Sequence, residues 1–261
     1  MTTYEVVGKP VTRQEGPDKV SGNFQYSADV TLPGMIWGKV LRSPYPHAKI
    51  VKIDASRALA MPGVHAVITG QDTLGMRIGR SVRDVPLLAE DEVRFVGEKV
   101  AAVAASDPDL AEEALLMIDV EYEPLPAVFD PVEAMEPGAP LVHAGSPVFE
   151  SSSGPVQPQG NILNHSTWSS GDVEQGFSES DQIFEHTFST TWVHQGYMEP
   201  YSCVVDIDDA GRVQVWANNK VPYTLRKQLA DALGLSEDQI LVNPCGIGGD
   251  FGGKSPAMNV P

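Results

Sequence analysis

Cysteine and positive charge are both scarce in this sequence of 261 residues. Its two cysteines, Cys203 and Cys245, can supply neither a disulfide framework nor the ligand set of a structural zinc or iron–sulfur site. The 18 basic residues face 35 acidic ones, and the formal charge of −17 opposes binding to nucleic acid or to an anionic membrane. We therefore expect a protein of the reducing cytoplasm that has no polyanionic partner.

Long apolar runs are also missing. No stretch approaches the ~20 residues needed to cross a bilayer, and no basic-plus-apolar segment at the N-terminus resembles a signal peptide. The hydrophobic content of 42% nevertheless suffices for one sizeable core or two modest ones. The sequence predicts an ordered protein of one or two domains without membrane insertion.

Short strands and helices alternate over the first 140 residues. Period-two patterns and capping residues predict strands over 35–41, 48–53, 64–69, 100–105 and 118–122, and helices over 54–61 and 107–117. Asp54 and Asp107 are the expected N-caps of the two helices. Because strands and helices recur with tight turns between them, residues 1–140 are expected to form an α/β or α+β domain.

The composition then shifts to Pro, Gly, Ser, Gln and Asn, which predicts an extended linker over residues 141–170. A second unit is expected over residues 171–261. Its predicted elements are a strand over 184–192, a hairpin of 202–207 with 212–217, a helix over 222–233 and a strand over 240–242. We expect these five elements to be an incomplete domain.

A dense glycine cluster, Gly246–Lys254 (GIGGDFGGK), follows the last predicted strand. Glycine lets a ligand approach the backbone, and consecutive N–H groups in such a loop form an anion-binding nest. The dinucleotide fingerprint fails because Phe251 stands at its third glycine, and the phosphate-loop pattern fails because no helix can follow before Pro256. The cluster therefore predicts a ligand-approach surface, with a plain turn as the alternative.

Ordered motifs extend over nearly the whole chain. In the first 140 residues they are Lys19–Gly22, Arg42–Ala48, Met61–Val64, Val96–Val103 and Val120–Val128, and after them come His194–Pro200 and Gly248–Lys254. In this order they resemble the N-terminal part of the large, molybdenum-bearing subunit of the xanthine dehydrogenase and aldehyde oxidase family of molybdenum hydroxylases. The resemblance implies an α+β fold, in which an α/β hammerhead domain precedes the first part of a molybdopterin-binding domain.

The resemblance also implies a molybdenum–molybdopterin cofactor and a reaction. Such an enzyme hydroxylates an aldehyde or N-heteroaromatic carbon with oxygen from water, and electrons leave through iron–sulfur and FAD centres on other subunits. The implied cofactor-binding residues are Gly249, Asp250, Phe251, Gly252, Gly253 and Gln195. Tyr197 and Ser255 are candidates for the substrate funnel. No direct metal ligand is expected in this chain, and the general base is expected on sequence that the chain does not contain.

Three positions depart from the family pattern. Asp250 replaces a usual glycine, so its carboxylate either lies near the cofactor or bends away. Ser255 stands where a xanthine-type enzyme has glutamate, which argues against purine substrates. Val193 occupies the position of a cofactor-contacting glutamine, but Gln195 lies two residues later, which keeps it on the same face of an extended strand.

Because the remaining cofactor contacts of this family come from later sequence, we expect one piece of a split molybdenum subunit. A second molybdopterin-domain chain would complete it, alongside iron–sulfur and flavin subunits, and a truncated product is the alternative. A non-catalytic scaffold subunit and a nucleotide-binding module are the competing functions.

Several polar residues have plainer interpretations. His194 is a packing or surface residue or a proton carrier, Glu199 shapes a turn rather than acting as base, and Lys254 contacts a phosphate or a carbonyl. Asp206, Asp208 and Asp209 fit a hairpin turn better than a cation site.

Overall fold

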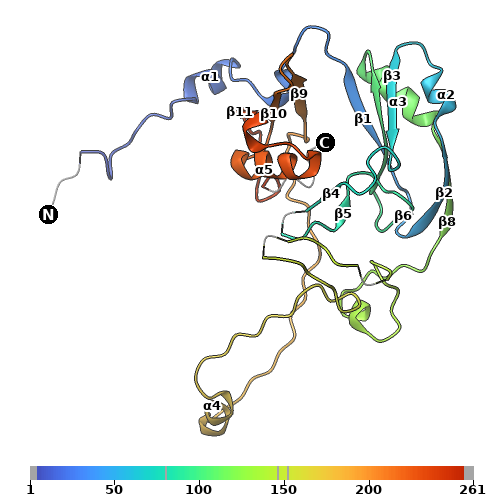
Figure 1. The fold of residues 1–261 in the computed structure, drawn as a ribbon. Coiled ribbons are helices and arrows are strands. Elements are labelled where there is room, and N and C mark those ends of the chain that lie inside the picture. Colours follow the sequence, from blue (N-terminus) through green and yellow to red (C-terminus); the bar gives the residue numbers. More distant parts are fainter. Residues whose placement is uncertain (1–4, 80, 146, 152, 256–261) are drawn as a thin grey trace. The chain divides into compact units, whose positions relative to one another are not determined.

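The computed structural model describes residues 5–79, 81–145, 147–151 and 153–255. They fall into two compact units, one within residues 34–194 and the other combining residues 1–33 with 195–261 (Figure 1). Both units mix helices with small sheets, as an α+β fold requires.

The first unit is built around strand β7 (Lys99–Ala105), which lies between β1 (Trp37–Arg42) and β3 (Val64–Thr69) and pairs antiparallel with both. Helix α3 (Pro108–Leu116) packs against this sheet, and the Asp107 carboxylate caps it by accepting the Leu110 N–H at 2.9 Å. Small side chains of β7 and α3 form the buried core, which lets helix and sheet approach closely. The structure confirms the predicted strands and helix here.

A second sheet of the same unit has the order β6 (Glu92–Val93), β2 (Ala48–Asp54), β8 (Asp119–Pro124). The predicted helix over 54–61 is shorter, because α2 spans only Ser56–Leu59. Asp54 stays in β2 and its carboxylate accepts the Ser56 N–H at 3.1 Å. The remaining short elements of this unit are β4 (Arg77–Ile78), β5 (Val85–Pro86) and η2 (Glu133–Met135).

The last part of the first unit, residues 163–194, differs from the prediction. The one regular element described between residues 163 and 194 is helix α4 (Val173–Glu179), which the sequence analysis missed; Asp172 caps it (Figure 1). The predicted strand over 184–192 is wrong for this structure, since these residues form no strand and are all exposed. A period-two pattern indicates an amphipathic strand but supplies no partner to pair with it.

The second unit contains strand β10 (Val213–Ala217), which pairs antiparallel with β9 (Cys203–Ile207) and parallel with β11 (Ile240–Asn243). Helix α5 (Pro222–Leu233) begins with proline at its first turn and ends at Gly234, whose φ of 66° closes it in the left-handed conformation. The Asp208 carboxylate accepts the N–H groups of Ala210 and Arg212, which confirms a hairpin turn there. The other elements are α1 (Gly16–Ser21), η1 (Ser27–Asp29) and η3 (Glu237–Gln239).

Candidate functional site

The glycine loop, residues 246–254, begins shortly after β11, and one carboxylate ties its two ends together. Glu199 Oε2 accepts the Gly248 N–H at 2.7 Å and the Lys254 ammonium at 2.5 Å. Charge-assisted hydrogen bonds of this kind are about twice as strong as neutral ones. Glu199 therefore fixes the loop, in agreement with the predicted positioning role.

Lys254 is completely buried, which is rare for lysine. Its Nζ donates to Glu199 Oε2 and also to the Glu199 carbonyl oxygen at 2.9 Å. The ammonium lies 4.7 Å from the centroid of the Tyr197 ring, within the range of a cation–π contact. Lys254 thus takes the carbonyl contact of the two alternatives and serves as an internal anchor of the loop.

The Asp250 carboxylate folds back on its own loop. It accepts the backbone N–H of Lys254 at 2.5 Å and of Gly252 at 3.2 Å, and Lys220 Nζ lies 2.5 Å from it. The hydrogen bond from Lys220, helped by these backbone donors, lowers the pKa of Asp250 below its ordinary value. Of the two predicted orientations, the Asp250 carboxylate therefore takes the one that bends away, and its hydrogen bonds to the chain stabilise the loop conformation.

Three successive backbone N–H groups in the loop have no hydrogen-bond acceptor among the described residues. Those of Gly249, Asp250 and Phe251 donate to no residue in the described part of the chain. Phe251 has a φ of 45°, an uncommon conformation for a non-glycine residue, and its ring is exposed. Strained backbone held by its surroundings is typical of functional sites, and free successive amides form an anion-binding concavity.

Two glycines let neighbouring side chains approach this loop. A Cβ on Gly248 would lie 2.8 Å from Glu199 Cβ, and one on Gly253 would lie 2.6 Å from Tyr197 Cε1 and 3.1 Å from Gln195 Oε1. The Tyr201 hydroxyl donates to the Gly253 carbonyl. The structure thus brings Gln195 and Tyr197 to the loop, and the predicted contact of Gln195 with a cofactor stays a prediction.

Tyr197 lies beside Tyr201, with ring centroids 5.7 Å apart and the rings nearly perpendicular. Burial, together with the hydrogen bond to Tyr201, raises the pKa of Tyr197 to about 12, so the phenol stays protonated at neutral pH. Ser255 follows Lys254 and is half-buried. A role for either residue in a substrate funnel remains a prediction.

The sequence analysis missed two contributors to the site, Tyr201 and Lys220. Lys220 lies 30 positions before Asp250, and only the turn after β10 brings the two together. No local pattern announces such a contact. The spacing of Tyr197 and Tyr201 around Glu199 was visible, but both rings turn toward the same lysine only in the folded chain.

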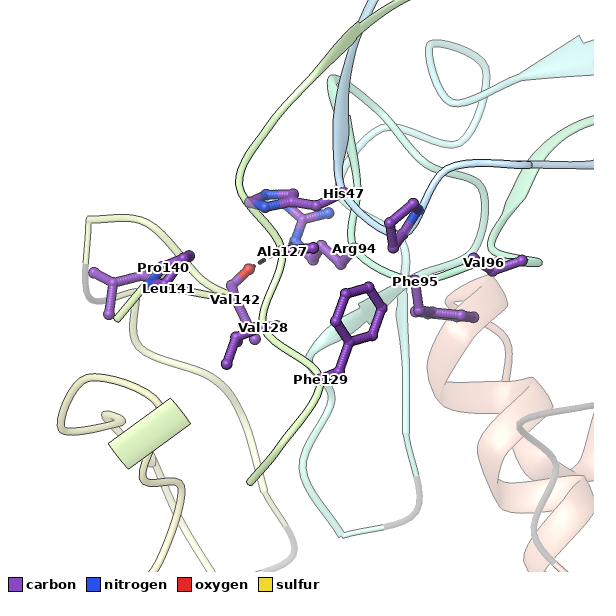
Figure 2. Close-up of a pocket in the computed structure, with 11 residues that line it drawn as sticks. His47, Arg94, Phe95, Val96, Ala127, Val128, Phe129, Pro140, Leu141 and Val142 are labelled. Carbon is purple, nitrogen blue, oxygen red and sulfur yellow. Dashed lines mark hydrogen bonds between the residues drawn. The ribbon is translucent and has the colours of Figure 1, made fainter. Parts of the chain in front are cut away.

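The first unit contains a cavity of about 350 Å³ (Figure 2). Its lining residues are Pro46, His47, Arg94, Phe95, Val96, Ala127, Val128, Phe129, Pro140, Leu141 and Val142. Both ring nitrogens of His47 are engaged, Nδ1 with the Pro126 carbonyl at 2.5 Å and Nε2 with Glu92 at 2.8 Å. Arg94 Nε donates to the Val142 carbonyl at 3.2 Å. Most of the lining side chains are apolar, and the hydrogen bonds of His47 and Arg94 are made to the protein itself.

Two further kinds of site are absent from the described ranges. No three His, Cys, Asp or Glu side chains in residues 5–255, outside the three undescribed positions, gather closely enough to hold a metal ion. None of the helices in those ranges has the length and apolar character to cross a membrane.

Comparison with known proteins finds two family models along the chain. Residues 21–126 match the family described as aldehyde oxidase and xanthine dehydrogenase, a/b hammerhead domain, and residues 156–261 match the molybdopterin cofactor-binding domain. A Bacillus subtilis (strain 168) protein, named as one of the subunits of a probable xanthine dehydrogenase, is 39% identical over 95% of this chain and 32% of its own length.

Two other relatives extend the comparison. The nicotinate dehydrogenase large molybdopterin subunit of Eubacterium barkeri is 33% identical over 96% of this chain and 56% of its own length. The crystal structure of quinoline 2-oxidoreductase from Pseudomonas putida 86 superposes with a TM-score of 0.82 at 32% identity, over 95% of this chain and 31% of that one. The chain thus spans between about a third and just over half of these relatives.

The ordered hammerhead and molybdopterin-binding segments, the fold they adopt and the glycine loop at the end of the second lead to one conclusion: the chain belongs to the xanthine dehydrogenase and aldehyde oxidase family and corresponds to the N-terminal part of its large subunit.

Proposed function

We propose that this chain supplies one side of a molybdenum–molybdopterin site in a hydroxylase acting on an aldehyde or N-heteroaromatic carbon. The observation that carries the proposal is the set of three free N–H groups at Gly249, Asp250 and Phe251, in a loop anchored by the buried pair of Glu199 and Lys254. The match of residues 156–261 to a molybdopterin cofactor-binding domain supports it.

The residues present fit such a group. Backbone amides can donate to an oxo or phosphate oxygen without an intervening side chain, and the space around Gly252 is open, with nothing within 4 Å of where a Cβ would lie. Gln195, whose side-chain oxygen lies next to Gly253, would add an amide contact to the bound group. When bound, the cofactor supplies the two-electron redox chemistry that hydroxylates the substrate carbon.

The chain's own residues orient and shield rather than exchange protons. Tyr197 keeps its proton at neutral pH because burial raises its pKa to about 12, which suits a hydrogen-bonding or packing role and not that of a base. The Glu199 carboxylate is held by Lys254 and Gly248. The general base of the reaction is therefore proposed to lie on polypeptide outside this chain.

The substrate class and the partners rest on the relatives. One relative is named as a nicotinate dehydrogenase subunit and one solved structure as a quinoline oxidoreductase, which supports an N-heteroaromatic substrate. Ser255, where the xanthine-type enzymes have glutamate, argues against purines, whereas the name of the Bacillus subtilis relative, a probable xanthine dehydrogenase subunit, argues for them. We propose a second molybdopterin-domain polypeptide, an iron–sulfur subunit and a flavin subunit as partners.

The decisive experiment is metal analysis of the complex purified with its native partners. We expect close to one molybdenum per copy of this chain, and we expect Gly253→Val, which pushes a side chain into Tyr197 and across the loop, to lower that ratio severely. Gly176→Ala in α4 is the matched control, because nothing lies within 4 Å of the added methyl group. A fully assembled complex without molybdenum would instead establish the non-catalytic scaffold function.

A further inference from the structure

Arg42 and Lys99, called here the cation pair, place two positive charges on neighbouring strands. They lie directly opposite each other in the antiparallel ladder of β1 and β7, just after a register shift between Leu41 and Arg42. The Cβ atoms of residues in such positions are about 4.5–5.5 Å apart, and like charges there destabilise a sheet. Irregularities of this kind re-aim side chains and are common beside functional sites. The stability of the fold therefore does not explain the cation pair.

The chain does not neutralise these two charges. Apart from Lys9, every other lysine or arginine in the described ranges forms an ion pair with an aspartate or glutamate. Arg42 instead donates one N–H to the Gly97 carbonyl at 2.9 Å, which leaves its other donors available. Lys99 Nζ has no hydrogen-bond acceptor among the described residues. In a chain with 35 acidic and 18 basic residues, two adjacent cations without a carboxylate are an exception.

The two members of the pair differ in burial, since Lys99 is half-buried and Arg42 is exposed. Burial lowers the pKa of Lys99 below its ordinary value, and repulsion from Arg42 lowers it further. No carboxylate of the described chain acts on this pKa in the opposite direction. An anion bound between the two side chains would replace this repulsion by two attractions.

We propose that Arg42 and Lys99 bind a small, doubly charged oxyanion of the phosphate class. A phosphate monoester carries a charge of about −1.5 to −2 at neutral pH, which matches two cations. The guanidinium offers a fork of parallel donors to two oxygens, and the ammonium donates to another. Both residues belong to the unit of residues 34–194, so this site is separate from the glycine loop and does not rest on the proposed cofactor.

The charge of the whole chain favours a small ligand. A nucleic acid or an anionic membrane would bring many negative charges against a protein with a formal charge of −17, whereas a single phosphate group meets only the cation pair. A carboxylate side chain from another protein carries one charge and would leave one of the two cations without a counter-charge. A free phosphate group satisfies both.

A phosphate titration of the complex purified with its native partners tests the site, with ionic strength held constant by chloride. Acylation of lysines by acetic anhydride, measured by mass spectrometry, reports the neutral amine, and a bound anion favours the unreactive ammonium. We expect saturating phosphate to slow the acylation of Lys99 at least about tenfold. Lys49, an exposed lysine paired with Glu123, should react at an unchanged rate. Acetate, with a single charge, should bind at least about tenfold more weakly than phosphate.

Matched variants assign the effect to the cation pair. Arg42→Gln is expected to weaken phosphate binding about tenfold or more, since it removes charge-assisted hydrogen bonds. Arg57→Gln removes an exposed arginine paired with Asp119 and should change the Kd less than about twofold.

Thermal unfolding of Lys99→Met gives a second measurement. This variant loses the repulsion from Arg42, so without phosphate we expect it to be at least as stable as the parent. Phosphate should raise the Tm of the parent more than that of Lys99→Met. Phosphate bound by the free amides of the glycine loop would stabilise both equally, so the difference between them reports the cation pair alone.

Slowing of Lys99 acylation that Arg42→Gln weakens and Arg57→Gln does not would establish the site. Acylation of Lys99 that is already much slower in the complex than in the chain alone, before phosphate is added, would mean that a polypeptide covers the cation pair, and this overturns the proposal. Equal slowing at Lys49, equal affinity for acetate, or equal stabilisation of the parent and Lys99→Met also overturns it.

Discussion

Lys254 and Glu199, 55 residues apart, form a buried ion pair with Nζ 2.5 Å from Oε2, and the lysine has no exposed surface. The same carboxylate binds the Gly248 N–H, so this pair closes the glycine loop at both ends. Glu199 Oε1 is also buried and has no hydrogen-bond partner among the described residues. Breaking such a pair costs more than the pair contributes, because it strands a charge away from water.

Lys254→Met is expected to destabilise the second unit strongly. Removing the ammonium leaves the Glu199 carboxylate buried and unpaired, a change that costs about 3–5 kcal/mol. Urea denaturation followed by circular dichroism measures the free energy of unfolding. The control Lys227→Met removes an exposed partner of Asp231 on α5 and should cost less than about 1 kcal/mol. Similar losses for the two variants would contradict the anchoring role.

Gly248→Ala and Gly176→Ala should change stability in opposite directions. The methyl group at Gly248 would meet Glu199 Cβ at 2.8 Å, and overpacking of this kind costs about 1–3 kcal/mol. Gly176 lies within helix α4 with open space around it, so alanine there should stabilise by about 0.5–1 kcal/mol. Thermal unfolding of the two variants against the parent chain gives both signs.

Phe251 offers a test of backbone strain. Its φ of 45° favours glycine, and its ring is 75% exposed, so little packing is lost on truncation. We expect Phe251→Gly to be more stable than Phe251→Ala by about 1 kcal/mol, since the left-handed region costs an alanine about that much. At an ordinary helical position alanine is the more stable of the two. If Phe251→Ala proved more stable than Phe251→Gly, the loop would carry no such backbone strain.

We expect the contribution of Asp250 to the free energy of unfolding to depend on pH. Because Lys220 and the backbone donors lower its pKa in the folded chain below the ordinary value of 3.8, its ionised form stabilises the fold above that pH. This stabilisation is fully present at neutral pH and disappears as the pH falls from about 3.8 through the lower folded pKa. Asp250→Asn should therefore be less stable than the parent at pH 7 and should approach it at low pH. Unfolding free energies measured from pH 7 to pH 2 give the comparison, and a constant difference over that range would rule the effect out.

The regular elements could be read from the sequence wherever local signals and long-range partners agreed. Helix α5 has proline at its start and glycine at its end, and β9 and β10 flank a turn that Asp208 closes with its own carboxylate. Residues 184–192 show the opposite case. Their alternation predicts a strand, yet a strand is completed by hydrogen bonds to another strand, which the described part of this chain does not provide.

The sequence by itself determined the family, the α+β class, the positions of most elements and the glycine loop, because motifs, caps and periodicity are properties of neighbouring residues. The tertiary structure decided what the polar residues of the loop do. Asp250 turned inward to its own amides and to Lys220, and Lys254 was buried against Glu199 and Tyr197. These are contacts across 30 and 55 residues, and only chain folding sets which side chain reaches which charge.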